Sequence, residues 1–433
     1  MHLPRAFLGF IQPMSKNVFP RSAGVALGLL LVTGCSTLSA HRQPPNEWID
    51  RDTGHRVVRL SQEPDSHSLY FNVNAYTKDG QWMVFTAPSG INMVNLKTRA
   101  IEKLVPAPAH IIMVGRKFGR LYYTKDHSLF SLDIDARATK KLFALPPHWT
   151  INTINSDETL AAGTITETDK SERDPNKVST RADEIKFMKT KGEMMEERLA
   201  SKTPMELFFL DLQTGRVVNR CQHGTDWLGH LQFSPTDPML LMFCHEGMWH
   251  NVTRIWLIHA DGTGLTCVHR RTMKMEIAGH EFWSADGSTV WYDLQTPRSV
   301  VFWLAGYNVK TGKRTWYHLT RDEWSVHFNC SPDGKLFAGD GGGPGNVAHA
   351  DDGKWLYLFH PEMTPNRMKI PSDDLISTGV FQAEKLVNMK RHTYSTLEPN
   401  VNFTPDGKWI VFRSDMHGAP QIYEVEVKRA GKK

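Results

Sequence analysis

Short runs in which apolar and polar residues alternate recur along the chain, and most of them follow a polar turn. Each unit contains a turn related to Ser-Pro-Asp-Gly, an apolar strand, a variable loop, a second strand and a turn of the Lys-Thr-Gly type. Residues 79–104 and 406–427 are two clear copies. Alternation of this kind around Asp-Gly turns is typical of antiparallel strands joined as a meander.

The unit is repeated through the whole body of the chain. Its first turn falls at seven places, Asp79-Gly80, Phe118-Gly119, Asp157-Glu158, Thr236-Asp237, Asp286-Gly287, Asp333-Gly334 and Asp406-Gly407. A repeat of about 40 to 50 residues made of short strands indicates the blades of a β-propeller. We therefore predict an all-β fold, a seven-bladed β-propeller with a short helical insertion. Residues 53–62 are expected to add a strand to the last blade and close the ring.

Two gaps between successive turns are longer than one repeat, and we predict an insertion in each. The first covers about residues 167–204 and is highly charged. Its apolar residues have helical spacing and predict an amphipathic helix, through Ile185, Met188, Met194, Met195 and Leu199. This helix either packs on one blade or forms a flap over one mouth of the propeller. The second insertion is expected over about residues 341–392.

The first 35 residues have the pattern of a targeting segment. An apolar run over residues 22–34 follows Lys16 and Arg21, and it is short for a membrane-spanning helix but suitable for a signal peptide. The run ends in Leu-Val-Thr-Gly before Cys35, which resembles a bacterial lipobox. We predict a lipoprotein signal peptide and lipobox over residues 1–35, a linker over 36–48 and the propeller over 49–433. A plain secretory signal is the alternative.

The same segment predicts the location of the protein. Ser36 and Thr37 follow the cysteine, and the lack of aspartate there is similar to lipoproteins of the outer membrane. The expectation is therefore a lipid anchor in the bacterial cell envelope, in the outer membrane and facing the periplasm.

Composition narrows the class of protein. The chain of 433 residues carries 51 Lys and Arg against 46 Asp and Glu, a formal charge of +5. This weak imbalance argues against nucleic-acid binding, which needs a basic face to neutralise phosphates. Besides Cys35 there are four cysteines, without a Cys-x-x-Cys pair, so a disulfide scaffold or a zinc site is not indicated. We expect mostly buried thiols, with one disulfide as the alternative.

Candidate chemistry lies in the loops that join blade strands, because propellers bind ligands near the central channel and function depends on those loops. The sequence contains no Ser-His-Asp elbow, phosphate-binding loop, dinucleotide fingerprint or His-Glu-x-x-His motif. Polar and aromatic residues do occur before or after many blade strands, and a closed ring could gather them. The predicted substrate-binding residues are His67, His230, His245, Trp249 and Asp340.

Ordered motifs at these loops resemble those of the oligogalacturonate lyases. They are DWLGH (226–230), FCHEG (243–247), TRIW (253–256), GHEFW (279–283), VHFNCSPDG (326–334), GDG (339–341) and NFTPDGKWIVFRSDMHG (402–418). The resemblance extends over essentially the whole mature chain. It implies a seven-bladed propeller that cleaves short pectic uronides by β-elimination with a metal ion.

The resemblance also assigns individual residues. The catalytic base corresponds to His280, the active-site arginine to Arg254 and one metal-ligand histidine to His327. The family's other ligands come from a Gln-x-x-His-x-His segment, where this chain has Ser395, Glu398 and Asn400. A carboxylate and an amide oxygen in place of two imidazoles favour a harder divalent ion, Mn²⁺ first, with Mg²⁺ or Ca²⁺ as alternatives.

These residue types suit elimination from a uronide. The C5 proton is weakly acidic because the neighbouring carboxylate is already negative, so a cation must neutralise that carboxylate and a base must take the proton. Histidine has a suitable pKa for the base, and Arg254 is expected to bind a substrate carboxylate. The predicted function is a polysaccharide lyase acting on uronic-acid oligosaccharides.

Two other classes of function remain open at this point. One is a non-catalytic binding or scaffold propeller resembling TolB. The other is a glycoside hydrolase, which would need two opposed carboxylates, for which Glu246, Glu281 and Asp340 are the candidates.

Overall fold

The computed structural model describes residues 44–167, 193, 195–346, 348, 352–365 and 375–431. The predicted signal peptide, the lipobox with Cys35 and residues 168–192 of the first insertion lie outside these described residues. The three domain boundaries therefore stay predictions. Within the described residues, no helix is long and apolar enough to cross a membrane.

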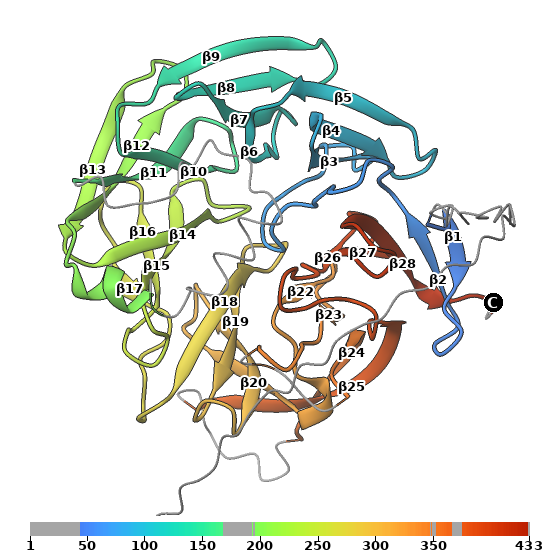
Figure 1. The fold of residues 1–433 in the computed structure, drawn as a ribbon. Helices are drawn as coiled ribbons and strands as arrows, with labels where there is room; N and C mark the ends of the chain where they lie inside the picture. The colour runs from blue at the N-terminus through green and yellow to red at the C-terminus, as the bar shows by residue number, and fades with distance from the viewer. Residues whose placement is uncertain are drawn as a thin grey trace, which may run out of the picture. The chain divides into compact units, whose positions relative to one another are not determined.

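Six hydrogen-bonded sheets are arranged around a central axis, and one of them, with 8 strands, consists of two blades, so the predicted propeller is confirmed (Figure 1). The first three blades contain β3 Trp82–Ala87, β4 Gly90–Asn95 and β5 Ile101–Pro106; β6 His110–Val114, β7 Leu121–Lys125, β8 Ser128–Asp133 and β9 Ala138–Ala144; and β10 Trp149–Ile154, β11 Leu160–Thr166, β12 Met205–Asp211 and β13 Val217–Gly224. The next two contain β14 Trp227–Phe233, β15 Leu240–Glu246, β16 Ile255–His259 and β17 Thr266–Cys267; and β18 Ile277–Trp283, β19 Thr289–Gln295, β20 Phe302–Asn308 and β21 Arg314–Leu319.

The last two blades complete the ring. They contain β22 Phe328–Cys330, β23 Phe337–Gly339, β24 Trp355–Met363 and β25 Ser377–Asn388; and β26 Asn402–Phe403, β27 Trp409–Ser414, β28 Gln421–Arg429, β2 His55–Arg59 and β1 Glu47–Ile49. A short 3-10 helix, η1 Arg321–Glu323, precedes the sixth blade. The strand β2 pairs antiparallel with β28, so the predicted closure by the N-terminal segment is confirmed.

Each of the seven predicted turns lies between the innermost segment and the next strand of a blade. In four of them a Ser or Thr hydroxyl donates a hydrogen bond to the Asp carboxylate two residues later, as between Ser284 and Asp286. The glycines have φ near +70°, a conformation that costs glycine least. Glu158 takes the same conformation, with φ of 59°, and this explains why the third turn works without glycine.

The innermost position of the first blade is irregular. Residues 67–76 run along β3 with only two bridges, His67 to Thr86 and Tyr76 to Met83. The segment therefore keeps its place in the ring while leaving Tyr70 and its neighbours out of the regular strand alternation.

The second predicted insertion is wrong in part, because residues 341–392 include two strands of the regular fold. The strands β24 and β25 lie in this interval and are the outer strands of the sixth blade. They are long, 9 and 12 residues, and this accounts for part of the wide interval between turns. The strand β25 also pairs in parallel with β21 of the fifth blade, which joins two blade edges that would otherwise be exposed.

The hydrophobic core lies between neighbouring blades. One cluster combines Val84 and Ile91 of the first blade with Leu121 and Tyr123 of the second. Equivalent clusters follow around the ring. Because each blade packs on the next, the innermost strands are fixed relative to one another around the channel.

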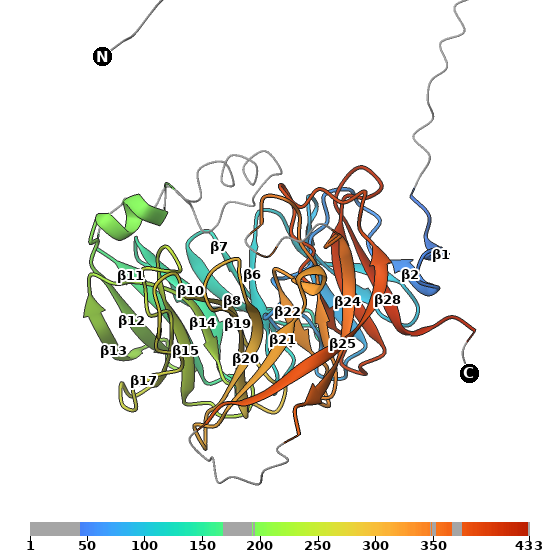
Figure 2. The same cartoon turned by 90° about the horizontal axis from the view of Figure 1, so that it is seen from below.

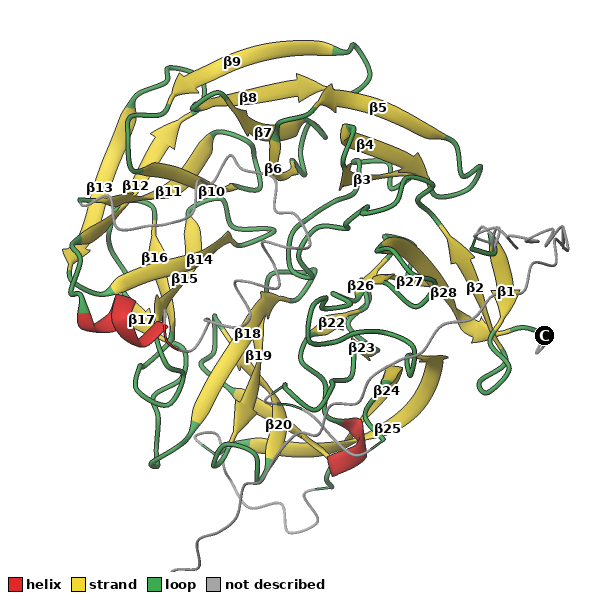
Figure 3. Cartoon of the chain, viewed as in Figure 1, coloured by secondary structure: helices red, strands yellow, loops and turns green. Residues whose placement is uncertain are grey.

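A short helix occupies residues 195–200 at the end of the first insertion (Figure 3). It lies on one face of the ring (Figure 2), and the Arg198 guanidinium lies 5.9 Å from the ring of Trp227. The described part of the insertion thus packs on the fourth blade.

The cysteines differ slightly from expectation. In the described chain, Cys221, Cys244, Cys267 and Cys330 are all free thiols. Only Cys244 is fully buried, and the other three are half-buried.

Candidate functional site

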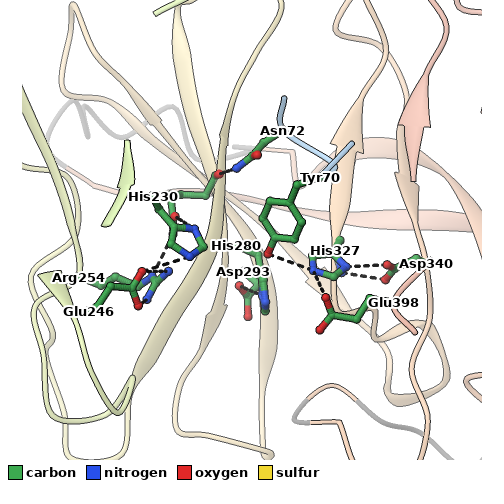
Figure 4. Close-up of polar contacts among 11 residues, drawn as sticks. Tyr70, Asn72, His230, Glu246, Arg254, His280, Asp293, His327, Asp340 and Glu398 are labelled. Atoms are coloured by element: carbon green, nitrogen blue, oxygen red, sulfur yellow. Dashed lines mark hydrogen bonds and ion pairs between the residues drawn. The ribbon is translucent and has the colours of Figure 1, made fainter. Parts of the chain in front are cut away.

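Two neighbouring blades carry a histidine at the same place on their innermost strands. The strand β14 contains Gly229-His230 and β18 contains Gly279-His280. Each pair lies where the register shifts at a bulge, and the φ angles of His230 and His280 are 49° and 47°. A bulge re-aims a side chain, and Figure 4 shows both imidazoles within one group of polar side chains.

His230 belongs to a set that we call the arginine cluster, formed by His230, Glu246, Arg254 and Glu281. The Arg254 Nη1 and Nη2 atoms donate to Glu246 at 2.7 and 3.2 Å, and its Nε donates to Glu281 at 3.1 Å. The ring nitrogens of His230 lie 3.2 Å from Glu246 and 3.1 Å from Glu281. The cluster therefore alternates positive and negative groups.

Electrostatics keep the arginine cluster ionised. Burial alone would raise the pKa values of Glu246 and Glu281, but Arg254 and His230 outweigh burial and hold both below the ordinary glutamate value. Burial would also lower the pKa of His230, but the two carboxylates outweigh it and raise that pKa. His230 is thus stabilised as an imidazolium.

The predicted contact between Arg254 and a substrate carboxylate does not fit this geometry. Its side chain is only 3% exposed, and Nε, Nη1 and Nη2 all donate to internal carboxylates. Arg254 therefore binds two buried carboxylates inside the protein and is not available to a substrate. The glycoside hydrolase candidates Glu246 and Glu281 are likewise bound to Arg254, so they do not form an open pair of opposed carboxylates.

His280 is oriented by an aspartate on the next strand. Its Nδ1 lies 3.0 Å from Asp293 Oδ1, and the imidazole is 21% exposed. Gly279 makes this contact possible, because a Cβ atom there would lie 3.1 Å from Asp293 Oδ1. The same Cβ would lie 3.6 Å from the Trp249 ring, so the predicted substrate-binding Trp249 is beside His280. With Nδ1 facing a carboxylate, Nε2 is the nitrogen that can accept a proton.

A second set, the aspartate cluster, consists of His327, Asp340, Glu398 and Asn400. The Nδ1 of His327 lies 2.7 Å from Asp340 Oδ2, and its backbone N–H donates to Asp340 Oδ1 at 2.8 Å. The Nε2 lies 3.7 Å from Glu398 Oε2. The ring centroids of His327 and His280 are 4.8 Å apart, which joins this cluster to the base predicted from the sequence.

Asp340 positions the aspartate cluster. It is completely buried, and besides His327 its Oδ2 accepts the backbone N–H of Asn400 at 3.2 Å. Its carbonyl oxygen accepts the Tyr394 hydroxyl at 2.8 Å. The prediction that Asp340 contacts substrate does not fit this burial, because the carboxylate is used inside the protein.

Asn400 and Glu398 offer oxygen donors for a cation. The Asn400 side chain is 1% exposed, yet its Oδ1 has no hydrogen-bond partner. An unpartnered buried oxygen is unusual and is expected where it ligates an ion. The described residues contain no group of three His, Cys, Asp or Glu side chains suited to a metal. The candidate set for a divalent cation is therefore His327 Nε2, Glu398 and the amide oxygen of Asn400, which is rich in oxygen donors.

Two other predicted residues lie apart from these contacts. His67 accepts from Arg413 Nη1 at 3.3 Å, and burial together with Arg413 lowers its pKa to about 3, so it is neutral. Arg413 also donates to the Glu398 carbonyl oxygen at 2.7 Å. His245 stacks on Trp256, with centroids 5.3 Å apart, and faces Asp226 at 3.8 Å. His67 is therefore linked to the aspartate cluster through Arg413, whereas His245 contacts a different set of side chains.

The structure adds two residues that the motifs do not assign. Asp293 orients His280, and the Tyr70 hydroxyl lies 3.3 Å from His327 Nε2. Asp293 could be found from the hairpin, because Gly279 and Asp293 pair across the turn at Asp286. Tyr70 comes from the first blade and is 257 residues from His327 in sequence, so no local pattern connects them.

Comparison with known proteins assigns the chain to a family. The sequence profile of the oligogalacturonate lyases matches residues 44–430. The chain belongs to the oligogalacturonate lyase family. It is similar to the oligogalacturonate lyase of Dickeya dadantii, 27% identical over 393 residues, which are 87% of this chain and 95% of that protein. The oligogalacturonide lyase of Pectobacterium atrosepticum is also 27% identical, with the same coverage.

A solved oligogalacturonate lyase in complex with manganese has the same fold. Its TM-score is 0.69 at 24% identity, over 89% of this chain and 96% of that chain. Membership in the oligogalacturonate lyase family makes the chain a polysaccharide lyase. A non-catalytic scaffold of the TolB type does not account for that match.

Proposed function

We propose that this protein cleaves short oligogalacturonides by β-elimination, with His280 as the base. The observation that carries the proposal is the His280–Asp293 pair, at 3.0 Å, beside the imidazole of His327 in a propeller of the oligogalacturonate lyase family. The proposed proton acceptor would thus lie next to the side chains proposed to bind a cation.

His280 has the features that proton abstraction requires. Asp293 accepts the N–H of Nδ1, which leaves the lone pair on Nε2, and it stabilises the imidazolium that forms when Nε2 takes the C5 proton. The ring is partly exposed, so a sugar can reach it. Trp249, which lies beside Gly279 and is half-buried, is an aromatic side chain close enough to His280 to contact the sugar.

We further propose that His327, Glu398 and Asn400 hold a divalent cation, Mn²⁺ being the first candidate. When bound, the cation supplies the positive charge that neutralises the uronide carboxylate next to C5. Support comes from the unpartnered Oδ1 of Asn400 and from the manganese complex of a solved oligogalacturonate lyase. Asp340 fixes the His327 ring so that Nε2 faces Glu398.

The decisive experiment replaces the base. His280→Ala should reduce the formation of the ultraviolet-absorbing unsaturated product from oligogalacturonides by about 10²-fold to 10⁴-fold, with binding and folding retained. The matched control is His223→Gln on β13, whose side chain is 63% exposed. Retained turnover in His280→Ala would remove His280 from the mechanism, and an inactive wild type with metal supplied would refute the proposed substrate.

We also propose that the protein is a lipoprotein of the outer membrane that faces the periplasm. The support is the apolar run before Cys35 and the residues that follow it. Cys35→Ser should prevent labelling by radioactive palmitate and release the protein from the membrane fraction. Unchanged labelling and fractionation would contradict the anchor.

A further inference from the structure

β-Elimination requires a proton donor as well as a base. When the C4–O4 bond breaks, the departing O4 carries an electron pair and must be protonated unless it is an unusually good leaving group. In a galacturonate ring the C5 hydrogen and O4 lie on opposite faces. A second group, on the other side of the sugar from His280, is therefore needed to protonate O4.

His230 is the member of the arginine cluster that can reach a ligand. Its side chain is 33% exposed, whereas those of Glu246, Arg254 and Glu281 are 8%, 3% and 0% exposed. His230 and His280 occupy matching bulges on adjacent innermost strands. Figure 4 shows His230 on the far side of His280 from the aspartate cluster. A sugar at His280 thus has an imidazole from each neighbouring blade available to it.

Charge in the arginine cluster requires that His230 be protonated. Two buried carboxylates, Glu246 and Glu281, face one guanidinium, Arg254, so the three together carry one excess negative charge. A buried excess charge is costly, and a proton on His230 removes it. Both ring nitrogens of His230 form ion pairs, Nδ1 with Glu281 Oε1 at 3.1 Å and Nε2 with Glu246 Oε1 at 3.2 Å, so Nε2 must turn from Glu246 toward O4 when it donates its proton.

We propose that His230, as an imidazolium, is the general acid that protonates the leaving O4. This inference rests on the proposed elimination. The C5–H bond breaks and its proton goes to His280 Nε2, while its electron pair forms the C4=C5 double bond. The C4–O4 bond breaks with its electron pair on O4, which takes the proton from His230 Nε2. Before the next turnover His280 returns a proton to water and His230 takes one from water.

The surroundings of His230 favour this role at neutral pH. The groups that face it are Glu246, Glu281, Arg254 and the ring of Tyr70. The two carboxylates raise the pKa of His230 despite its burial and so favour the protonated imidazolium. As pH rises through the pKa of His230 the acid is lost, which predicts the alkaline limb of the pH profile for kcat.

The first test compares two leaving groups. On a galacturonide disaccharide, His230→Gln should lower kcat by about 10²-fold or more. On a uronide whose O4 carries 4-nitrophenol, which leaves without protonation, the same variant should lose less than about threefold. His280→Ala should lose activity on both substrates. Retained turnover of the nitrophenyl substrate also shows that the variant is folded.

The outcomes separate this inference from the proposed function. Equal losses of His230→Gln on both substrates would overturn the acid role, and His223→Gln should change neither rate. Tyr70→Phe should show no dependence on the leaving group, and if it does while His230→Gln does not, Tyr70 is the acid. A wild type that is inactive on both substrates would instead refute the elimination itself.

The second test moves the alkaline limb. Glu246→Gln removes one of the carboxylates that stabilise the imidazolium, so the pKa of His230 should fall and the alkaline limb of kcat should shift to lower pH by about one unit. An alkaline limb that does not move would contradict the assignment of that limb to His230.

Discussion

In each of the two clusters around the channel a histidine lies between two carboxylates, but only the arginine cluster contains a guanidinium that balances negative charge. In the arginine cluster one histidine lies between Glu246 and Glu281, and in the aspartate cluster His327 lies between Asp340 and Glu398. Arg254 bonds to both carboxylates of the first cluster. In the second, the carboxylate of Glu398 is 24% exposed and Asn400 Oδ1 has no partner.

This difference indicates what each cluster can do. The arginine cluster contains its own cation, so it is complete without a ligand and serves to hold His230 charged. In the aspartate cluster the carboxylate of Glu398 is partly exposed and Asn400 Oδ1 has no hydrogen-bond partner, which supports the proposed binding of a cation from solution. In the proposed mechanism, similar residue types thus serve proton donation on one side of His280 and cation binding on the other.

The largest effect is expected when Arg254, the cation inside the arginine cluster, is replaced. Arg254→Met leaves two buried carboxylates without their guanidinium and should lower the free energy of unfolding by about 3–5 kcal/mol, measured by urea denaturation. A triple variant that adds Glu246→Gln and Glu281→Gln removes the uncompensated charges and should regain most of that loss. If Arg254→Met loses less than about 1 kcal/mol in the free energy of unfolding, Arg254 does not stabilise the two carboxylates as proposed.

A smaller effect is expected from each of the two His–Asp pairs. Asp340→Asn should weaken Mn²⁺ binding by about 10-fold to 100-fold, measured by isothermal titration calorimetry, because His327 loses the carboxylate that orients it. Asp293→Asn is the matched variant at His280 and should lower kcat while leaving Mn²⁺ affinity unchanged. Equal Mn²⁺ affinities in wild type and Asp340→Asn would disprove the assigned role of Asp340.

Much of the fold follows from the turns, and so do both His–Asp pairs. Turn chemistry is local, which is why the seven blades and the closure by β2 could be predicted. In an antiparallel hairpin, residues equidistant from the turn pair, as Gly279 does with Asp293 and Phe328 does with Gly339. His327 and Asp340 come next in that register, so this pair was also within reach of the sequence.

The contacts between blades were not predictable in the same way. The burial of Arg254 depends on Glu281 from the next blade, 27 residues later, and on Glu246 eight residues before it. A sequence pattern identifies Arg254 as polar and near a strand end, but not whether its guanidinium faces the channel or two internal carboxylates. The two strands within the long interval before the last turn were not predictable for a related reason, because the lengths of β24 and β25 depend on pairing within and between blades.

The smallest effect on stability is expected at Glu398, and this residue tests most directly whether the aspartate cluster binds a cation. In the presence of a chelator, Glu398→Gln should change the free energy of unfolding by less than about 1 kcal/mol, because its carboxylate is partly exposed and glutamine keeps the shape. Added Mn²⁺ should raise the Tm of the wild type, since an ion that binds only the folded state stabilises it. That rise should be largely absent in Glu398→Gln and retained in His223→Gln. If Mn²⁺ raises the Tm of Glu398→Gln as much as that of the wild type, Glu398 is not a ligand. If Glu398→Gln loses much stability in the presence of chelator, the Glu398 carboxylate stabilises the fold as the carboxylates bound to Arg254 do.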